Sequence, residues 1–181
     1  GSARSALFNW LFIKRFQGIF ILRIEDTNAE LAQPEYYQAI TEPLEWLGLH
    51  WDEGPYYQSQ RTEKYIEAVN SLVAKGRAYY CDCDREKIEK RNKDSGFQGG
   101  YDQHCRERNI PDGVGTTIRF KTPELGSVEI NDLIRGQVTF KNSELEDFVI
   151  RRGDGTPVFL VANAVDDADM AITHVIRGED L

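Results

Sequence analysis

The sequence predicts an α/β fold in which a parallel sheet is interrupted by a stretch of short antiparallel strands. Residues 20–24 form a near-continuous apolar run, which is typical of a parallel strand covered on both faces. Residues 172–176 are expected to form another short strand, and both segments lead into charged residues. Between them, over residues 116–148, the apolar period shortens towards two, as in antiparallel strands. We therefore expect a core made of residues 1–78 and 157–181, divided by an insertion over residues 79–156.

The composition describes a globular protein and excludes several classes. With 181 residues, the chain is long enough for one domain with an insertion. Its net charge of −8 argues against general affinity for nucleic acid but allows a local basic face. No apolar run approaches membrane-spanning length, and nothing at the start resembles a signal peptide. The 3 cysteines do not form a disulfide pattern, so a reducing cytoplasm is the expected location.

The first third of the chain predicts helices around one strand. Apolar residues at helical spacing predict a helix over residues 3–18, followed at once by a strand over residues 19–24. This is the second half of a βαβ unit. A helix starting at Pro34 is expected to end at Gly48, and residues 51–55 have the composition of a turn. A further helix is expected over residues 56–76.

The insertion contains a basic helix and the short strands. Residues 85–93 hold five basic and two acidic side chains, and residues 95–100 are expected to form a loop. The functional interpretation of this helix is contact with nucleic-acid phosphates. The more common explanation is a solvated face with pairs such as Glu86–Lys90 at i,i+4 spacing.

Charged residues at the two strand ends form the first candidate site. If both strands belong to one parallel sheet, their charged ends meet at one crevice. Carboxylates can hold an ammonium and an arginine can hold a carboxylate, so mixed charge fits an amino acid. The alternative, slightly favoured by physics alone, is a network of internal salt bridges and helix caps. The residues concerned are Arg23, Glu25, Asp26, Asn163, Asp166, Asp167, Arg177, Glu179 and Asp180.

Three cysteines form the second candidate site. Cys81, Cys83 and Cys105 could supply three thiolates to a tetrahedral zinc ion, with Tyr101 or His104 as the fourth ligand. The spacing favours Tyr101, because a turn can bring it to the same point as Cys105, whereas adjacent side chains diverge. The alternative is three reduced cysteines near a surface. A zinc site here would be structural and would hold together an insertion that lacks a core of its own.

Long blocks of the sequence closely resemble bacterial glutamyl-tRNA synthetase. The resemblance covers essentially the whole chain, and its blocks are long enough to be specific. They are residues 3–10, 20–27, 45–49, 51–55, 57–61, 133–136, 142–145, 165–167 and 172–180.

The resemblance implies a Rossmann-like class I synthetase core with an inserted α+β subdomain that binds the tRNA acceptor stem. It implies ATP-dependent activation of glutamate, with Mg²⁺, and transfer to the 3′ end of tRNA(Glu). By the family pattern, Glu25 binds the substrate ammonium, Arg177 helps to hold a carboxylate and Asn163 lines the same pocket. Phe159 stands where the family usually has a tyrosine, which removes one hydroxyl contact and puts that contact or strict glutamate selection in question.

Two departures from the family concern ATP. Gly1 and Ser2 would be the last residues of the His-x-Gly phosphate motif, whose histidine is absent, and Glu179 is the third residue assigned to the nucleotide site. A Lys-Met-Ser-Lys-like loop is absent as well. Because both elements stabilise charge on the reacting phosphates, the chain alone is expected to be an inactive catalytic fragment.

Two other functions compete with this interpretation. Glutamyl-queuosine tRNA(Asp) synthetase shares the Cys-x-Cys and Tyr-x-x-x-Cys pattern, with the tyrosine as a zinc ligand. Residues 7–10 and 169–174 resemble the full synthetase instead, and Glu25 and Arg177 distinguish the chain from glutaminyl enzymes. The non-enzymatic alternative is a zinc-stabilised RNA-binding module. A monomer without membrane contact is expected in each case.

Overall fold

The computed structural model describes residues 2–27 and 34–178, and these residues divide into two compact units. The first unit comprises residues 1–65 and 162–181, and the second comprises residues 66–161. Two helices, α3 (Thr62–Ala74) and α5 (Phe159–Asp169), cross from one unit to the other. The predicted insertion over residues 79–156 lies wholly within the second unit, and its boundaries stay a prediction.

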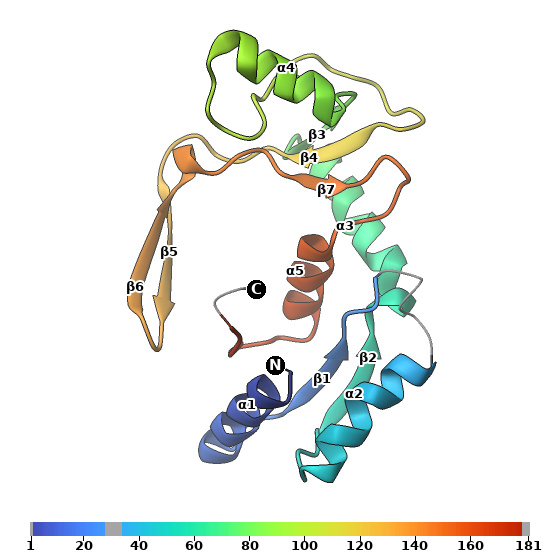
Figure 1. The fold of residues 1–181 in the computed structure, drawn as a ribbon, viewed down its shortest axis with the longest axis vertical. Helices are drawn as coiled ribbons and strands as arrows, with labels where there is room; N and C mark the ends of the chain where they lie inside the picture. Colours follow the sequence, from blue (N-terminus) through green and yellow to red (C-terminus); the bar gives the residue numbers. More distant parts are fainter. Residues whose placement is uncertain (1, 28–33, 179–181) are drawn as a thin grey trace. The chain divides into compact units, whose positions relative to one another are not determined.

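The first unit contains a parallel pair of strands joined through a helix. Helix α1 (Ser2–Phe16) precedes β1 (Ile21–Ile24), and α2 (Pro34–Trp46) precedes β2 (Glu53–Tyr57), which pairs with β1 in parallel. Helices α1 and α2 lie beside the strand pair (Figure 1). The expected helix starts near residue 3 and at Pro34 are confirmed.

Strand β2 corrects the prediction of a turn over residues 51–55. Pro55 lacks a backbone donor, but it can lie in a strand where no partner needs that donor. Gly54 has a φ of +99°, and a Cβ there would clash with the carbonyl oxygen of Leu22. The close approach coincides with a shift of register between β1 and β2, so this strand depends on a glycine that by itself predicts a turn. The expected helix over residues 56–76 also begins later, as η2 (Gln58–Arg61) followed by α3.

The predicted strand over residues 172–176 is wrong. Residues 172–178 form neither helix nor strand. The Asn9 side chain bonds the backbone of Ile176 in both directions: its Nδ2 donates to the Ile176 carbonyl at 2.6 Å, and its Oδ1 accepts from the Ile176 N–H at 3.2 Å. A side chain of α1 therefore takes the place of a neighbouring strand.

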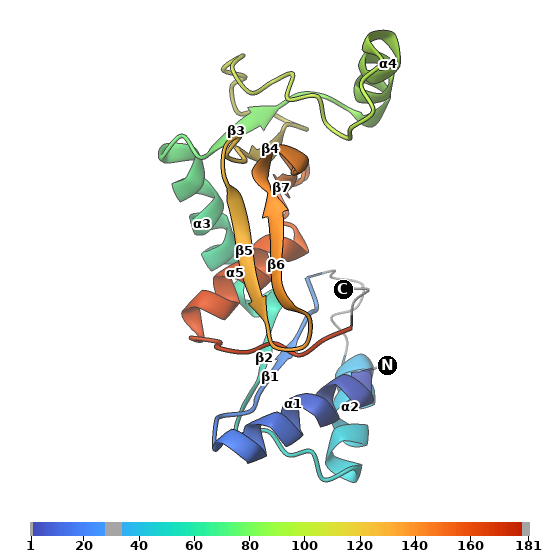
Figure 2. The same ribbon diagram turned by 90° about the vertical axis from the view of Figure 1, so that its left-hand side faces the viewer.

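The second unit contains the predicted antiparallel strands. Strands β3 (Ala78–Cys81), β4 (Thr117–Phe120) and β7 (Val149–Arg151) form an antiparallel sheet in the order β3–β4–β7. Strands β5 (Ser127–Asp132) and β6 (Gly136–Lys141) form a separate hairpin that extends away from this sheet (Figures 1 and 2). The short helix η3 (Asn142–Glu144) follows the hairpin.

The predicted basic helix is confirmed as α4 (Arg85–Ser95). Asp84 caps its first turn by accepting from the Lys87 backbone N–H at 2.8 Å, and Gly96 ends it with a φ of 72°. None of its residues is buried, so local capping and ion pairs stabilise it more than packing does. Among the described residues, no helix is long and apolar enough to cross a membrane.

Candidate functional site

A charged network in the first unit is centred on Asp166 of α5. The Asp166 side chain is fully buried, and its Oδ1 accepts from Arg61 Nε at 2.8 Å. Its Oδ2 accepts from the Tyr65 hydroxyl at 2.8 Å and from Gln58 Nε2 at 3.4 Å. Arg61 also pairs with Asp169 one turn further along α5. Burial and the hydrogen bond to Asp166 raise the pKa of Tyr65, so this phenol stays a donor.

Arg23 of β1 extends the network to the strand end. Its Nη1 lies 2.6 Å from Asp167 Oδ1, and its Nη2 lies 3.4 Å from Asn163 Oδ1 and 4.0 Å from Glu25 Oε1. Its Nε lies 3.9 Å from Asp166 Oδ2. Arg23 therefore joins the charged end of β1 to one face of α5.

Asp26 is held by a tyrosine of α2 and by a serine in the segment that follows β2. Its carboxylate accepts from the Tyr37 hydroxyl at 2.6 Å, from the Ser59 backbone N–H at 2.8 Å and from the Ser59 hydroxyl at 2.7 Å. Burial works to raise the pKa of Asp26, but these hydrogen bonds outweigh it and hold the pKa below its usual range. Asp26 thus fixes the end of β1, directly after the half-exposed Glu25.

The structure brings some of the predicted substrate-binding residues together and leaves others apart. Glu25 and Asn163 both reach Arg23, so the structure brings these two together. Phe159 is half-buried one turn before Asn163 on α5. Arg177 is exposed and has no hydrogen bond or ion pair with another of the described residues.

Of the three residues assigned to the ATP site, the structure describes only Ser2. Gly1 and Glu179 lie outside the described residues, and Ser2 begins α1. The network around Asp166 matches the internal salt bridges that the sequence also allowed. Glu25 is half-exposed, and no residue in the described part of the chain accepts from the Asn163 amino group.

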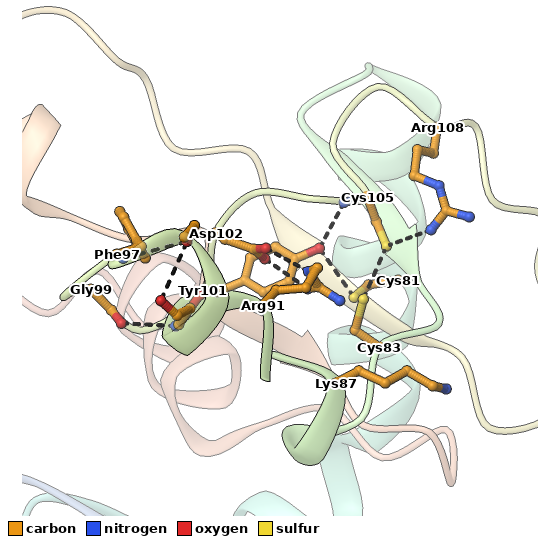
Figure 3. A network of polar contacts seen from close by, with 12 residues as sticks. Cys81, Cys83, Lys87, Arg91, Phe97, Gly99, Tyr101, Asp102, Cys105 and Arg108 are labelled. Carbon is orange, nitrogen blue, oxygen red and sulfur yellow. Dashed lines mark hydrogen bonds and ion pairs between the residues drawn. The ribbon is translucent and has the colours of Figure 1, made fainter. Parts of the chain in front are cut away.

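The three cysteine sulfurs of the second unit lie together. All of them lie within 4.8 Å of one another, and Cys83 Sγ and Cys105 Sγ are 3.5 Å apart (Figure 3). Cys81 ends β3, Cys83 precedes α4, and Cys105 follows the loop after α4. Residues 22 positions apart are therefore brought to one point. Asp82 accepts from the Cys105 thiol at 3.2 Å.

The Tyr101 hydroxyl lies beside these sulfurs, whereas His104 is exposed. The Tyr101 oxygen is 3.3 Å from Cys81 Sγ and accepts from the Cys105 backbone N–H at 2.9 Å (Figure 3). Tyr101 is only 3% exposed, and the Arg119 guanidinium lies over its ring at 3.6 Å. His104 is not among the residues whose ligand atoms cluster with the thiols. Tyr101 therefore lies nearer to the thiols than His104 does, and its role as a metal ligand stays a prediction.

Burial and neighbouring groups shift the pKa values of Cys81 and Cys83 in opposite directions. Burial raises the pKa of Cys81, but hydrogen bonds from Tyr101, the Cys83 backbone and Arg119 lower it more, so the net shift is downward. Burial and the neighbouring Cys105 thiol raise the pKa of Cys83 to about 12. Burial and the thiols also raise the pKa of Tyr101. Donors aimed at Cys81 favour a thiolate there, which is the form that binds metals.

Several charged residues of the basic helix α4 form ion pairs within the helix or with the loop that follows it. Arg85 bonds Glu89 at 2.6 Å, and Arg91 makes a two-pronged contact with Asp102 at 2.6 and 2.8 Å. Lys90 and Lys93 form no ion pair within the part of the chain that the structure describes. Both interpretations of this helix therefore stay open at those two lysines.

Sequence reasoning did not single out Gln58 or Arg119. Gln58 is fully buried between Asn163 and Asp166, and Arg119 donates from β4 to Cys81 Sγ at 3.4 Å. A glutamine in a polar block and an arginine in a strand carry no local signal of such contacts, because their partners are distant in sequence. Only the fold brings them to these sites.

The sequence and the arrangement of helices and strands together place the chain among the catalytic domains of the class I tRNA synthetases. The family model described as "tRNA synthetases class I (E and Q), catalytic domain" matches residues 1–181, and the chain belongs to this family.

Proteins similar to the chain over nearly its whole length include several glutamate–tRNA ligases. It is 49% identical to glutamate–tRNA ligase 1 of Acidithiobacillus ferrooxidans over 184 residues, covering 99% of this chain and 40% of that protein. It is 50% identical to glutamate–tRNA ligase of Salinispora arenicola, covering 99% of this chain and 38% of that one. A crystal structure of a glutamate tRNA ligase from Elizabethkingia meningosepticum in complex with its amino acid matches with a TM-score of 0.82 and 32% identity, covering 98% of this chain and 40% of that chain. The chain thus spans about 40% of the length of such relatives.

Proposed function

We propose that the chain supplies the catalytic domain of an enzyme that activates glutamate with ATP and transfers it to the 3′ end of tRNA(Glu). The observation that carries this proposal is the identity of about one half, over the whole chain, to glutamate–tRNA ligases. The activity belongs to an enzyme of the relatives' full length. We expect it to be a monomer in the cytoplasm.

Glutamate is held at the end of β1. Glu25 binds the substrate ammonium, and its half-exposed carboxylate, 4.0 Å from Arg23, supports that role. Asn163 and Arg177 contact substrate carboxylate groups, and the lack of a partner for Arg177 among the described residues leaves its guanidinium available. Phe159 contributes only its ring where the family pattern has a hydroxyl.

ATP with Mg²⁺ is bound near the start of α1 and after residue 178. Ser2 would contribute a backbone donor at the N-terminus of α1, which favours phosphate, and the family pattern assigns Gly1 to the same site. Glu179 is the remaining residue assigned to this nucleotide site. Magnesium supplies charge neutralisation on the phosphates when it is bound.

Zinc is held by Cys81, Cys83, Cys105 and Tyr101. Zinc–sulfur bonds of about 2.3 Å place tetrahedral thiolates about 3.8 Å apart, and the three sulfurs already lie within 4.8 Å of one another. The Tyr101 oxygen, 3.3 Å from Cys81 Sγ, would be the fourth donor. The ion would be structural: it would tie the end of β3 to the loop after α4.

The insertion over residues 79–156 contacts the acceptor stem of the tRNA. The net charge of residues 85–93 is opposite in sign to that of the chain, which favours phosphate contact by this helix. The zinc-bound loop would hold α4 by its first turn, since Cys83 stands directly before the cap residue Asp84.

The test is a charging assay with the full-length enzyme, radiolabelled glutamate, ATP and purified tRNAs. Glutamyl-tRNA(Glu) should form. Product on queuosine-containing tRNA(Asp) alone would identify the glutamyl-queuosine enzyme, whose pattern of cysteines and tyrosine the chain shares. Acceptor-stem binding with no charged product on either tRNA would identify an RNA-binding module.

A further inference from the structure

A chain of buried hydrogen bonds sets the orientation of the Gln58 amide. Gln58 is fully buried at the start of η2. Its Nε2 donates to Asn163 Oδ1 at 2.8 Å and to Asp166 Oδ2 at 3.4 Å. The Asp166 carboxylate takes donors from Arg61 and Tyr65, so it acts as an acceptor only. The amino end of Gln58 must therefore face both Asp166 and Asn163.

The orientation of Asn163 follows from that of Gln58. Asn163 Oδ1 also accepts from Arg23 Nη2 at 3.4 Å, and a guanidinium has donors only. If the Asn163 amide were turned over, its NH₂ group would face two donors. Its Nδ2 is therefore directed away from Gln58 and Arg23, and no residue in the described part of the chain accepts from it.

We propose that Gln58 is a positioning residue for the amino-acid substrate, because it sets Asn163 to donate from Nδ2 to a carboxylate oxygen of glutamate. This inference rests on the proposed function, in which Asn163 lines the glutamate site. An Asn163 amide held this way offers only donors at that point. It fits an acid oxygen and repels the NH₂ group of an amide.

The other end of Gln58 supports this role. Gln58 Oε1 is buried and has no hydrogen-bond partner among the described residues. A buried acceptor without a donor destabilises a fold, and an apolar side chain of similar length would avoid that loss. The presence of a glutamine at position 58 is therefore explained by the groups that its amino end bonds, Asn163 and Asp166, and not by its Oε1.

The experiment is a double-mutant cycle in the full-length enzyme. Gln58→Met keeps the length of the side chain and removes its amide. It should raise the KM for glutamate about tenfold, the scale of one hydrogen bond to a charged group, while the KM for ATP stays unchanged. In an Asn163→Ala background the same change should raise the glutamate KM no further, because Gln58 acts through Asn163.

Two results overturn the inference. One is an unchanged glutamate KM in Gln58→Met, and the other is an equal increase in both backgrounds, which a merely structural role would give. If Gln58→Met does not fold, the unmodified enzyme labelled with ¹⁵N-asparagine decides. The side-chain amide signal of Asn163, assigned by its loss in Asn163→Ala, should move as glutamate is added, and a signal that does not move contradicts the inference.

These outcomes are separate from failure of the proposed function. An unmodified enzyme that does not attach glutamate to tRNA contradicts the proposed function and this inference together. An active enzyme whose glutamate KM ignores Gln58 contradicts the inference alone.

Discussion

Replacing the buried Asp166 by asparagine should destabilise the first unit strongly. Asp166→Asn keeps the shape of the side chain but turns one oxygen into an NH₂ group. One oxygen faces Arg61, and the other faces Tyr65 and Gln58, so either orientation sets donor against donor. Arg23 also loses a charge 3.9 Å from its Nε.

The expected loss in the free energy of unfolding depends on which ion-pair partners Arg23 and Arg61 retain in this variant. Removing one partner of a buried ion pair costs about 3–5 kcal/mol when the other charge is left alone. Arg61 keeps Asp169, and Arg23 keeps Asp167 at 2.6 Å. Neither guanidinium is stranded, so we expect a loss of about 2–3 kcal/mol, the scale of hydrogen bonds to a charged group.

The matched control is Asp167→Asn, one residue along α5. Its side chain is 37% exposed and its partner is Arg23, so the loss should be about 1 kcal/mol or less. Urea unfolding followed by tryptophan fluorescence measures both variants, because the 3 tryptophans of the chain, Trp10, Trp46 and Trp51, all belong to the first unit. Equal midpoints for the two variants would refute the reasoning about burial.

Three further predictions concern the metal, the substrate and acid. Cys83→Ser should remove bound zinc, measured by metal analysis of protein purified without chelator. Tyr101→Phe should weaken zinc binding more than His104→Ala does, and the reverse order would contradict the ligand assignment. Phe159→Tyr should lower the glutamate KM by a factor that corresponds to about 1 kcal/mol, and a higher KM would show that the pocket is packed for another role. The lowered pKa of Asp26 contributes stability that is fully present above its unfolded pKa of about 4 and is lost as the pH falls through the lower folded value. The difference in unfolding free energy between wild type and Asp26→Asn should therefore shrink below about pH 4, and a constant difference would contradict this assignment.

The sequence correctly predicted those helices and strands that depend on residues close to one another in the chain. Helix α4 begins at a capping aspartate and ends at a glycine with positive φ, and both residues are visible in the sequence. The shortening of the apolar period towards two over residues 116–148 predicted β4, β5 and β6, because cross-strand packing depends on that alternation. The clustering of the three cysteines followed from their residue types and spacing.

The elements that the sequence did not predict depend on distant partners. Strand β2 contains Gly54 and Pro55, and only its pairing with β1 makes it a strand. Residues 172–176 have the composition of a strand, but Asn9 takes the backbone groups of Ile176 instead. The contact between Gln58 and Asn163 joins residues 105 positions apart, so no local pattern reports it.

The central claim is that the end of β1 binds glutamate. The most direct test is the measurement of kcat and KM for glutamate in the full-length enzyme carrying Glu25→Gln. The substitution keeps the size of the side chain and removes the charge that would pair with the substrate ammonium. The predicted result is a loss of about 2 kcal/mol in kcat/KM for glutamate, roughly thirtyfold, with tRNA affinity unchanged. Arg177→Ala should lose a similar amount, whereas Glu53→Gln, an exposed change at the start of β2, should lose nothing. Unchanged kcat and KM for glutamate in both Glu25→Gln and Arg177→Ala would contradict the claim.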